Sequence, residues 1–373
     1  MMRYIDEYRD QELALGLMNR LRAIAQHPWV LMEVCGGQTH TLVRYGIDKL
    51  LPAGMEMIHG PGCPVCVTPL EMIDRAIAIA GMPKVILASY GDMMRVPGSN
   101  HDLLHARAVG ADVRMVYSPL DALEMARQNP EREVVFFAVG FETTAPANAA
   151  AVYQARRLGI GNFSLLASHV LVPPALEALL QSEGNRVQGL IAPGHVCSIV
   201  GLNAYEKLAK RFAIPIVVGG FEPVDLMEAI VMLTEQLEEG RAVVENQYSR
   251  SVRSDGNRNA VQMVESVLEV CDRNWRGMGR IPKSGLRMRA EYRAWDAEYK
   301  FAVAEMTVAE PSACLAAEIL QGHRKPDGCP AFGRECTPEH PLGAPMVSTE
   351  GACSAYYQYR RLAEPAVAMG GLR

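Results

Sequence analysis

Short apolar runs alternate with amphipathic segments along the first 225 residues of the chain. The runs cover residues 30–34, 55–59, 84–90, 112–117, 133–141, 162–170, 187–192 and 214–219. They are rich in β-branched or aromatic residues and are bounded by Gly, Pro or Asp, which is typical of parallel strands buried on both faces. The segments between them, such as 70–80 and 120–128, predict helices. This alternation indicates an α/β fold with doubly wound parallel sheets.

Two of the predicted helices carry start signals. Thr68-Pro69-Leu70-Glu71 has the spacing of a capping box with Pro at the first helical position. Ser118-Pro119-Leu120-Asp121 has nearly the same layout. With Thr68 as the N-cap, Cys66 is expected two residues outside its helix, where the helix dipole favours a thiolate.

Short sequence echoes suggest two similar α/β units. The segment 59–66, which holds Cys63 and Cys66, follows one predicted strand, and the segment 192–197 follows another. Gly140-Phe141-Glu142 recurs as Gly220-Phe221-Glu222, each time after an apolar run. We therefore expect the two halves to be related by duplication.

The pattern changes after residue 225. Helices are predicted at about 223–239 and 257–272, with Cys271 in the core face of the second one. Residues 275–301 look irregular and basic. The basic stretch from Arg273 to Arg293 is typical of a solvated surface loop, with a docking patch for an acidic partner as the alternative. From residue 311 the chain is rich in Cys, Pro and Gly, with one short helix at about 312–321. Such a segment builds little core of its own, and bound metal can supply the missing stability.

Composition narrows the class of protein. Lys and Arg total 37 against 42 Asp and Glu, so the formal net charge of −5 argues against a general nucleic-acid binder. No run approaches the roughly 18–20 apolar residues that span a bilayer, and the N-terminus does not resemble a signal peptide. We expect a cytoplasmic protein with no nucleic-acid or membrane partner. In that compartment nine cysteines are expected to be ligands or nucleophiles instead of a disulfide framework.

Four of the cysteines lie close together near the C-terminus: Cys314, Cys329, Cys336 and Cys353. Four thiolates suffice for one tetrahedral zinc ion or one four-iron cluster. Zinc sites usually contain close Cys-x-x-Cys pairs, and none occurs here, so the wide spacing favours an iron–sulfur cluster. Zinc and unbound thiols remain the alternatives. His323 and His340 are expected to be bystanders.

Three cysteines of the first half follow predicted strands, where ligands gather in parallel α/β sheets. Cys35 precedes Gly36-Gly37, which lets the backbone approach a ligand closely, and His40 can donate a proton or serve as a site histidine. Cys63 and Cys66 form a Cys-x-x-Cys between a strand and a helix, which favours a redox pair over half a zinc site.

Weaker candidates occupy the second predicted unit. His195 is a possible ligand or proton donor, with a structural loop histidine as the alternative, and Cys197 follows the equivalent strand. Glu142 and Glu222 are possible acids or bases, although carboxylates that cap turns are commoner. The chain contains no Walker loop, no dinucleotide fingerprint after the first strand and no radical S-adenosylmethionine motif, so those chemistries lack support.

Several longer motifs run through the whole chain in a fixed order. They are Cys35-Gly36-Gly37-Gln38-Thr39-His40, Gly60-Pro61-Gly62-Cys63-Pro64-Val65-Cys66, Gly140-Phe141-Glu142-Thr143-Thr144, Pro193-Gly194-His195-Val196 and Glu350-Gly351-Ala352-Cys353. Together with the C-terminal cysteine spacing, this pattern resembles the HypD family of [NiFe]-hydrogenase maturation proteins.

The resemblance implies a maturation scaffold with redox activity, on which an iron atom receives one carbonyl and two cyanide ligands. It implies a small HypC-type partner, a HypE-type cyanide donor and Cys35 as a ligand of that iron. Cys63 and Cys66 would perform thiol–disulfide chemistry, and Cys314, Cys329, Cys336 and Cys353 would hold a [4Fe-4S] cluster. The implied fold is two similar α/β domains plus a cluster domain.

These expectations divide the chain into four parts. An N-terminal helix within 1–28 packs on the C-terminal domain, and the first α/β domain covers 29–130 with Cys35, Cys63 and Cys66. The second α/β domain covers 131–225, and the iron–sulfur domain covers 226–373. Two rival functions are an iron–sulfur thiol–disulfide reductase acting on protein disulfides and a zinc-stabilised adaptor without redox activity.

Overall fold

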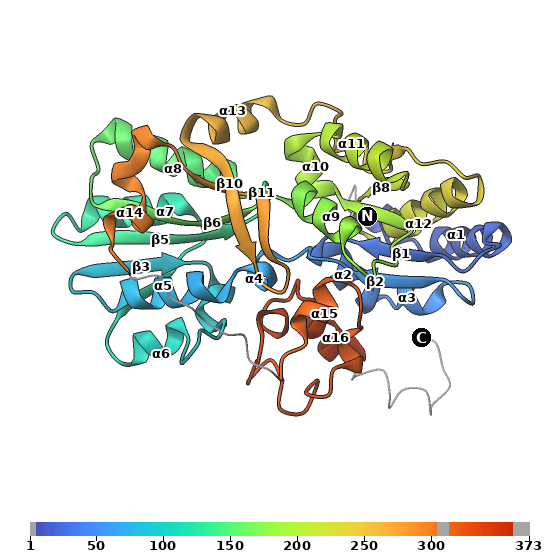
Figure 1. Ribbon diagram of the computed structural model, residues 1–373, viewed down its shortest axis with the longest axis horizontal. Helices are drawn as coiled ribbons and strands as arrows, with labels where there is room; N and C mark the ends of the chain where they lie inside the picture. The colour runs from blue at the N-terminus through green and yellow to red at the C-terminus, as the bar shows by residue number, and fades with distance from the viewer. Residues whose placement is uncertain (1–4, 304–312, 361–373) are drawn as a thin grey trace.

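Two β-sheets with helices packed on their faces form the body of the protein, as the computed structural model shows for residues 5–303 and 313–360 (Figure 1). The sheets lie end to end along the long axis of the molecule. The C-terminal segment lies beneath the junction between them (Figure 1). The α/β class expected from the alternating pattern is confirmed.

The first sheet is entirely parallel, with the strand order β2-β1-β7-β8-β9. Its strands are β1 (Val30–Glu33), β2 (Glu56–His59), β7 (Gly189–Pro193), β8 (Ile216–Gly219) and β9 (Val244–Asn246). The second sheet has the order β10-β11-β6-β5-β3-β4. Its strands are β3 (Val85–Ser89), β4 (Asp112–Met115), β5 (Glu133–Gly140), β6 (Phe163–Val170), β10 (Leu268–Trp275) and β11 (Gly279–Met288).

Helices cover both faces of each sheet. In the first half they are α1 (Gln11–Ile24), α2 (Gly36–Arg44), α3 (Ile47–Leu50), α4 (Pro64–Val67), α5 (Leu70–Ala80), α6 (Leu103–Ala108), α7 (Pro119–Gln128) and α8 (Ala145–Leu158). The second half contains α9 (Val172–Gln181), α10 (Gly194–Val200), α11 (Asn203–Phe212), α12 (Pro223–Glu238), α13 (Arg258–Val267), α14 (Ala297–Lys300), α15 (Ala316–Leu320) and α16 (Ala352–Arg360). Short 3-10 helices are η1 (Asp6–Tyr8), η2 (Gly91–Arg95), η3 (Ala290–Trp295), η4 (Pro326–Gly328) and η5 (Ala344–Met346).

All eight apolar runs form the predicted strands. β5 and β6 are the clearest cases, because nearly every residue of both strands is buried between helices on the two faces. A strand covered on both sides needs a continuous apolar run, and this is the pattern that the sequence displays.

The two sheets share a strand order, but the expected domain boundaries differ from the observed division. Numbered within each sheet, the first four strands have the order 2-1-3-4 in both. Four strands of the second sheet, β3 to β6, are inserted between β2 and β7 of the first sheet, and β10 and β11 join the second sheet after β9. The segments after β2 and β7 therefore belong to the same sheet, whereas the two Gly-Phe-Glu segments belong to different sheets.

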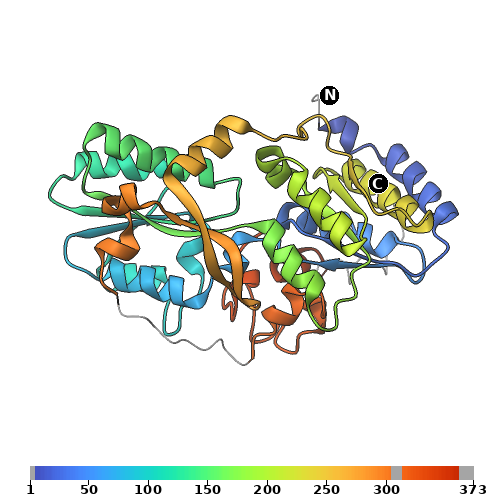
Figure 2. The same cartoon turned by 45° about the horizontal axis from the view of Figure 1, so that its top comes forward.

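A β-hairpin replaces the predicted helix end at 268–272 and much of the loop predicted at 275–301. α13 ends at Val267, and β10 and β11 then form an antiparallel pair that extends the second sheet from β6. The hairpin crosses in front of the junction between the sheets (Figure 2). The residues of β10 alternate between partly buried and exposed, because one face packs on the protein and the other meets solvent.

The tip of the hairpin binds two other parts of the molecule. Trp275 stacks on Phe141, with 6.1 Å between ring centroids, and its indole N–H donates to Ser284. The next backbone N–H, that of Arg276, donates to the carbonyl of Val67 in α4 at 2.8 Å. Gln321 of the C-terminal segment donates to the carbonyl of Gly277 at 2.7 Å. The hairpin thus joins the junction to the C-terminal segment.

Helix α1 packs on α12, which itself covers the first sheet. Arg20 pairs with Glu235, and the Trp29 indole donates to Glu238 at 2.7 Å. The N-terminal helix therefore lies on the first sheet and not on the cysteine-rich part of the C-terminal segment.

The short helix predicted at 312–321 is α15, which covers Ala316–Leu320, and residue 312 lies outside the described residues. Among the helices described, none is long and apolar enough to cross a membrane.

A candidate thiol and metal site between the sheets

Cys35 lies directly after β1, where it caps the N-terminus of α2. The backbone N–H groups of Gly37 and Gln38, in the first turn of this helix, favour the thiolate and lower the pKa of Cys35. Gly36 allows the C-terminal segment to approach, because a Cβ at this position would come within 2.4 Å of the Glu350 Cβ. The Gly-Gly sequence therefore serves close packing beside Cys35.

A buried hydrogen-bond network centred on Glu33 fixes the loop that contains Cys35. The Glu33 carboxylate accepts the Cys35 backbone N–H at 2.9 Å, the Thr39 hydroxyl at 2.5 Å and His59 Nδ1 at 2.6 Å. His59 Nε2 lies 3.0 Å from the hydroxyl of Tyr356 in α16. The sequence interpretation gave no role to Glu33, His59 or Tyr356. The only signal of Glu33 and His59 was a polar side chain within an apolar run.

The environment of Cys35 keeps its thiol protonated. Burial raises the pKa of Cys35 to about 12, with further repulsion from Glu350 and Glu33, and the backbone donors offset only part of this. A thiol of this kind ionises when a cation takes the place of its proton. Cys35 is therefore suited to binding a metal ion, for which the nearby carboxylates add attraction.

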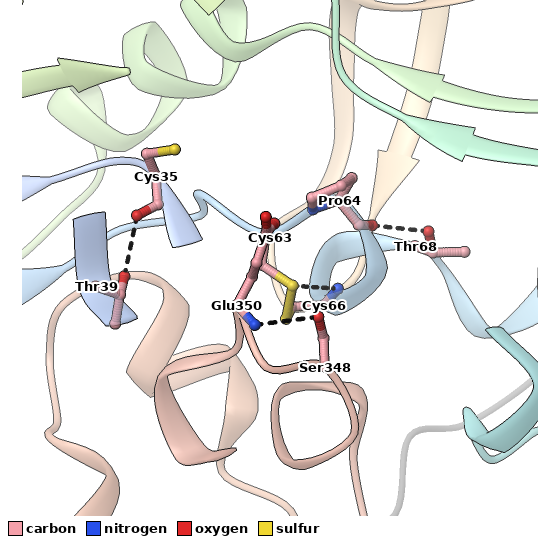
Figure 3. The surroundings of a disulfide bond; sticks show 8 residues. All are labelled: Cys35, Thr39, Cys63, Pro64, Cys66, Thr68, Ser348 and Glu350. Carbon is pink, nitrogen blue, oxygen red and sulfur yellow. Dashed lines mark hydrogen bonds between the residues drawn. A yellow bond between two sulfur atoms is a disulfide. The ribbon is translucent and has the colours of Figure 1, made fainter. Parts of the chain in front are cut away.

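Cys63 and Cys66 form a disulfide bond (Figure 3). Both residues are buried, at 3% and 0% exposure, so bulky thiol reagents and folded protein substrates do not reach them. The loop that contains them binds the Cys35 loop, since the N–H of Gly36 donates to the carbonyl of Gly62 at 2.8 Å. The disulfide and Cys35 thus occupy neighbouring loops after adjacent strands.

The predicted capping box at Thr68 is wrong. Cys63 is the N-cap of α4, which includes Cys66, and Thr68 ends this short helix by donating to the carbonyl of Pro64 at 2.9 Å. The expected thiolate at Cys66 is replaced by the disulfide. The capping box at Ser118 is confirmed at the start of α7.

Cys314, Cys329, Cys336 and Cys353 line one cavity in the C-terminal segment, together with apolar residues such as Ile319, Leu342 and Met346. Gly343 makes room for them, because a Cβ there would lie 2.4 Å from the sulfur of Cys314. The backbone N–H of Leu342 donates to the sulfur of Cys336 at 3.4 Å.

The four thiols need a compensating positive charge if they ionise. The pKa of Cys353 is raised well above its usual value by burial and then by Cys314, Cys336 and Cys329. Several thiolates in one buried cavity repel each other unless metal ions neutralise them. The donor set therefore fits a metal centre. Within the described ranges, no three His, Cys, Asp or Glu side chains are gathered closely enough to hold a single metal ion.

The short helix η5 connects this cavity to the disulfide. Pro345 and Met346 of η5 line the cavity, and η5 also packs against α4, which carries Cys66. Ser348 and Glu350 follow η5 and lie beside Cys35 and the disulfide (Figure 3). The chain between Ala344 and Cys353 thus touches all three groups of cysteines.

His40 lies on α2, but both of its ring nitrogens bind the C-terminal segment. Nδ1 faces the carbonyl of Thr349 at 3.3 Å, and Nε2 faces the hydroxyl of Tyr359 at 3.1 Å. A carbonyl only accepts, so Nδ1 carries the proton and Nε2 accepts from Tyr359. In this state His40 docks the C-terminal segment onto α2.

Cys197 lies one helical turn beyond the end of β7, the strand next to β1, and not in a second unit. It is fully buried. Its pKa is raised by burial, and the charges of Glu142 and Cys35 add to this, which places Cys197 near both groups. The Tyr205 hydroxyl of α11 is its neighbour.

Glu142 reaches this same region from the second sheet. One carboxylate oxygen accepts the backbone N–H of Val172 at the start of α9, at 3.0 Å. The other oxygen has no hydrogen-bond partner among the described residues. Burial raises the pKa of Glu142 to about 7.

Glu222 and His195 have mainly structural contacts. Glu222 begins α12 and pairs with Arg9 at 2.5 Å, in agreement with the capping alternative. His195 stacks on Phe221 with 3.7 Å between ring centroids, and burial lowers its pKa. Phe221 in turn lies beside Gly37. His195 therefore supports the start of α2 indirectly, through the ring of Phe221.

The placement of Cys271 in a helical core is wrong. The residue lies on β10, partly exposed, beside Arg273 and Arg287. It is distant in the fold from the C-terminal cavity and serves as a natural control in cysteine replacement.

Two mainly parallel sheets place a free thiol and a buried disulfide beside a four-cysteine cavity of the C-terminal segment, which defines an α/β protein with clustered thiol groups. A HypD family model, described as the hydrogenase formation hypA family, matches residues 12–360. The chain is 50% identical over 370 residues to the hydrogenase maturation factor HypD of Rhodobacter capsulatus, which covers 96% of this chain and 98% of that one. The corresponding factors of Azotobacter vinelandii and Escherichia coli are 47% and 46% identical, over 99% and 96% of this chain and 100% and 99% of theirs. The chain belongs to the HypD family.

Proposed function

We propose that this protein acts in hydrogenase maturation as the scaffold on which an iron atom receives two cyanide ligands and one carbonyl ligand. The observation that carries the proposal is the convergence of three cysteine groups on the segment between Ala344 and Cys353. A scaffold for a low-spin ferrous centre needs a soft ligand and a supply of electrons, and this arrangement provides residues for both.

Cys35 is the proposed ligand of the iron, which is the substrate of the assembly. Burial raises the pKa of its thiol, and the charges of Glu350 and Glu33 raise it further and would attract a cation. Binding of iron would release the thiol proton. A small HypC-type partner would contribute a second thiolate, and a HypE-type donor would deliver cyanide.

Cys314, Cys329, Cys336 and Cys353 are the proposed ligands of a [4Fe-4S] cluster. The four sulfurs surround a cavity without converging on one point, which suits a cluster with a thiolate at each corner better than a single zinc ion. The N–H group of Leu342 directed at Cys336 is the kind of donor that tunes such clusters. When bound, the cluster supplies single electrons, and Cys63 and Cys66 hold or release the electron pair of their disulfide.

The structure disfavours the two rival functions. A reductase of protein disulfides must expose its cysteine pair, whereas Cys63 and Cys66 are buried. A zinc adaptor requires ligands gathered round one ion, which the described part of the chain lacks.

The proposal is tested by metal analysis and infrared spectroscopy of full-length protein purified without oxygen from cells that mature hydrogenase. We expect about four cluster irons and four sulfides per chain, together with bands of bound cyanide and carbonyl. Cys35→Ser should abolish these bands and leave the sulfide content unchanged.

Cys271→Ser is the matched control, since it replaces a thiol on β10 and should preserve both signals. Cyanide and carbonyl bands that persist in Cys35→Ser would refute the assignment of the iron ligand. Zinc without sulfide would refute the cluster.

A further inference from the structure

Helix α16 connects a proposed cluster ligand to the helix that begins at Cys35. Cys353 lies in the first turn of α16, and Cys35 is the N-cap of α2. The two helices pack against each other, and Val43 of α2 forms a small buried core with Ala355 and Tyr356 of α16. The position of α16 therefore affects the start of α2.

The Tyr356 side chain is fixed by two neighbours. Its ring meets the His59 ring edge to face, with 5.4 Å between centroids, and its hydroxyl lies 3.0 Å from His59 Nε2. The Arg360 guanidinium lies over the same ring, 3.7 Å from its centroid. Tyr356 follows Cys353 by about one helical turn, so a displacement of Cys353 also moves the hydroxyl.

His59 extends this contact to the Cys35 loop. Its Nδ1 lies 2.6 Å from one oxygen of Glu33, and the other oxygen accepts the backbone N–H of Cys35 at 2.9 Å. An unbroken series of three hydrogen bonds thus runs from the Tyr356 hydroxyl to the Cys35 loop. His59 and Glu33 are buried, so water does not replace a lost partner. In such a buried network a missing partner is costly, and each bond depends on the geometry of the next.

The start of α16 depends in turn on the four-cysteine cavity. Cys353 lines this cavity together with the other three C-terminal cysteines. The chain around them contains only short helices, and a metal that binds its cysteines orders a segment of this kind. Occupation of the cavity should therefore hold Cys353, and with it Tyr356, in the position that bonds His59.

We propose that Tyr356, acting through His59 and Glu33, couples occupation of the four-cysteine cavity to the geometry of the Cys35 loop. The inference rests on the proposed function, because it takes a cluster in the cavity and iron at Cys35. A chain without its cluster holds the Cys35 loop loosely and binds iron poorly, so iron is not captured where the source of electrons is missing. Tyr356 and His59 are positioning residues, since they act on the Cys35 loop through Glu33.

The reaction of Cys35 with iodoacetamide tests the coupling. The protein is the full-length chain, purified without oxygen from cells that lack the cyanide donor, and equal iron and sulfide contents show that Cys35 is free of iron. The thiol is partly exposed, so this small reagent reaches it, and peptide mass spectrometry separates Cys35 from the other cysteines. Cys336→Ser, which lacks a cluster ligand, should react at Cys35 about fivefold or more faster than the parent, because its loop is loosely held.

Tyr356→Phe removes only the hydroxyl and should give most of this acceleration, with iron and sulfide contents that match the parent. The double variant Tyr356→Phe/Cys336→Ser should react no faster than Cys336→Ser alone, since both changes break the same series. Effects that multiply in the double variant would show that the two sites act independently, which would overturn the inference. His59→Asn is the second variant, used also if Tyr356→Phe does not retain the cluster. Its amide can keep the bond to Glu33 but lacks the Nε2 atom, so the same acceleration is expected.

Tyr359→Phe is the matched control. It removes a hydroxyl from the same helix that also faces a histidine, at 3.1 Å from His40 Nε2, but His40 bonds the Thr349 carbonyl and not Glu33. This variant should keep the parent rate. Equal acceleration in Tyr359→Phe would overturn the inference, because general loosening of α16 would then explain both results. The parent rate in Tyr356→Phe, with the cluster present, would overturn it as well and leave the scaffold function intact. Absence of iron and sulfide from the parent would overturn both proposals.

Discussion

The Glu142 carboxyl shows how burial alters a single residue at the junction of the sheets. Its pKa is raised from 4.5 to about 7 because the charged form is desolvated, and only one of its oxygens is bonded. Between these two values the folded protein keeps a proton that the unfolded chain has released. The folded state therefore binds more protons, and the free energy of unfolding falls as the pH rises through this window.

Glu142→Gln should remove this dependence. The contribution of Glu142 is fully present below about pH 4.5 and is lost by about pH 7, with a total on the order of 3 kcal/mol at about 1.4 kcal/mol per pK unit. The variant should gain stability relative to the parent as the pH rises, while glutamine keeps the acceptor for Val172. Urea unfolding of both proteins at several pH values measures the difference. A difference that stays constant with pH would show that Glu142 titrates normally.

The sequence identified the residues that carry chemistry by their type, and it missed those that act through position. Cys35, Cys63 and the C-terminal cysteines stand out because cysteines near glycines are conspicuous in any chain. Glu33 and His59 sit inside apolar runs, where a polar residue has many possible explanations. Their significance depends on which groups the fold places beside them, and these groups are distant in sequence.

At the scale of elements, the close approach of α2 and the C-terminal segment depends on Gly36. A Cβ at this position would lie 2.4 Å from the Cβ of Glu350 and 2.5 Å from its carbonyl oxygen, so backbone must move to admit it. Gly36→Ala should therefore push the segment that carries Glu350 and Cys353 away from Cys35.

We expect Gly36→Ala to destabilise the protein by about 1–3 kcal/mol through overpacking and to increase proteolysis of the C-terminal segment. Gly16→Ala is the control, because Gly16 lies in α1 with nothing within 4 Å of the added Cβ. That change should be neutral or stabilising by about 0.5–1 kcal/mol. Equal protease resistance of the Gly36 variant and the parent would show that the two elements do not need this contact.

Elements with a single consistent pattern were predictable, and those with mixed patterns were not. β5 and β6 are continuous apolar runs, and α12 is a long helix with the expected bounds. β10 follows α13 without an intervening turn residue. The charged, solvent-facing residues of β10 resemble the polar side of an amphipathic helix, so the sequence predicted that the helix continues. β11 contains a proline and several basic residues, and tertiary packing on β6 makes it a strand.

At the scale of the whole molecule, the order of the chain hides the division into two sheets. Strands β3 to β6 of the second sheet interrupt the first sheet between β2 and β7, and β10 and β11 follow β9. Division of the chain into consecutive segments therefore assigns strands of one sheet to different domains. This interruption also has a consequence for the site. The chain passes the junction several times, and each passage leaves a loop there, which brings Cys35, the disulfide and Glu142 together.

The same arrangement predicts how electrons reach the buried disulfide. Opening the Cys63–Cys66 bond takes two electrons and two protons and yields two thiols. Direct attack by an external reagent is hindered because both cysteines are buried, whereas η5 connects α4 to the cavity of the four C-terminal cysteines. If the proposed cluster feeds the disulfide, Cys336→Ser should slow the reduction of the disulfide by a one-electron donor, because the buried bond then lacks its route for electrons. Acid quenching at successive times, followed by denaturation, alkylation and mass spectrometry, counts the thiols at Cys63 and Cys66, with Cys271→Ser as the control that should keep the parent rate. A general loosening of the fold in Cys336→Ser would expose the disulfide and speed its reduction, so the two explanations have opposite signs. Equal rates in the parent and the variant would show that electrons reach the disulfide by another route.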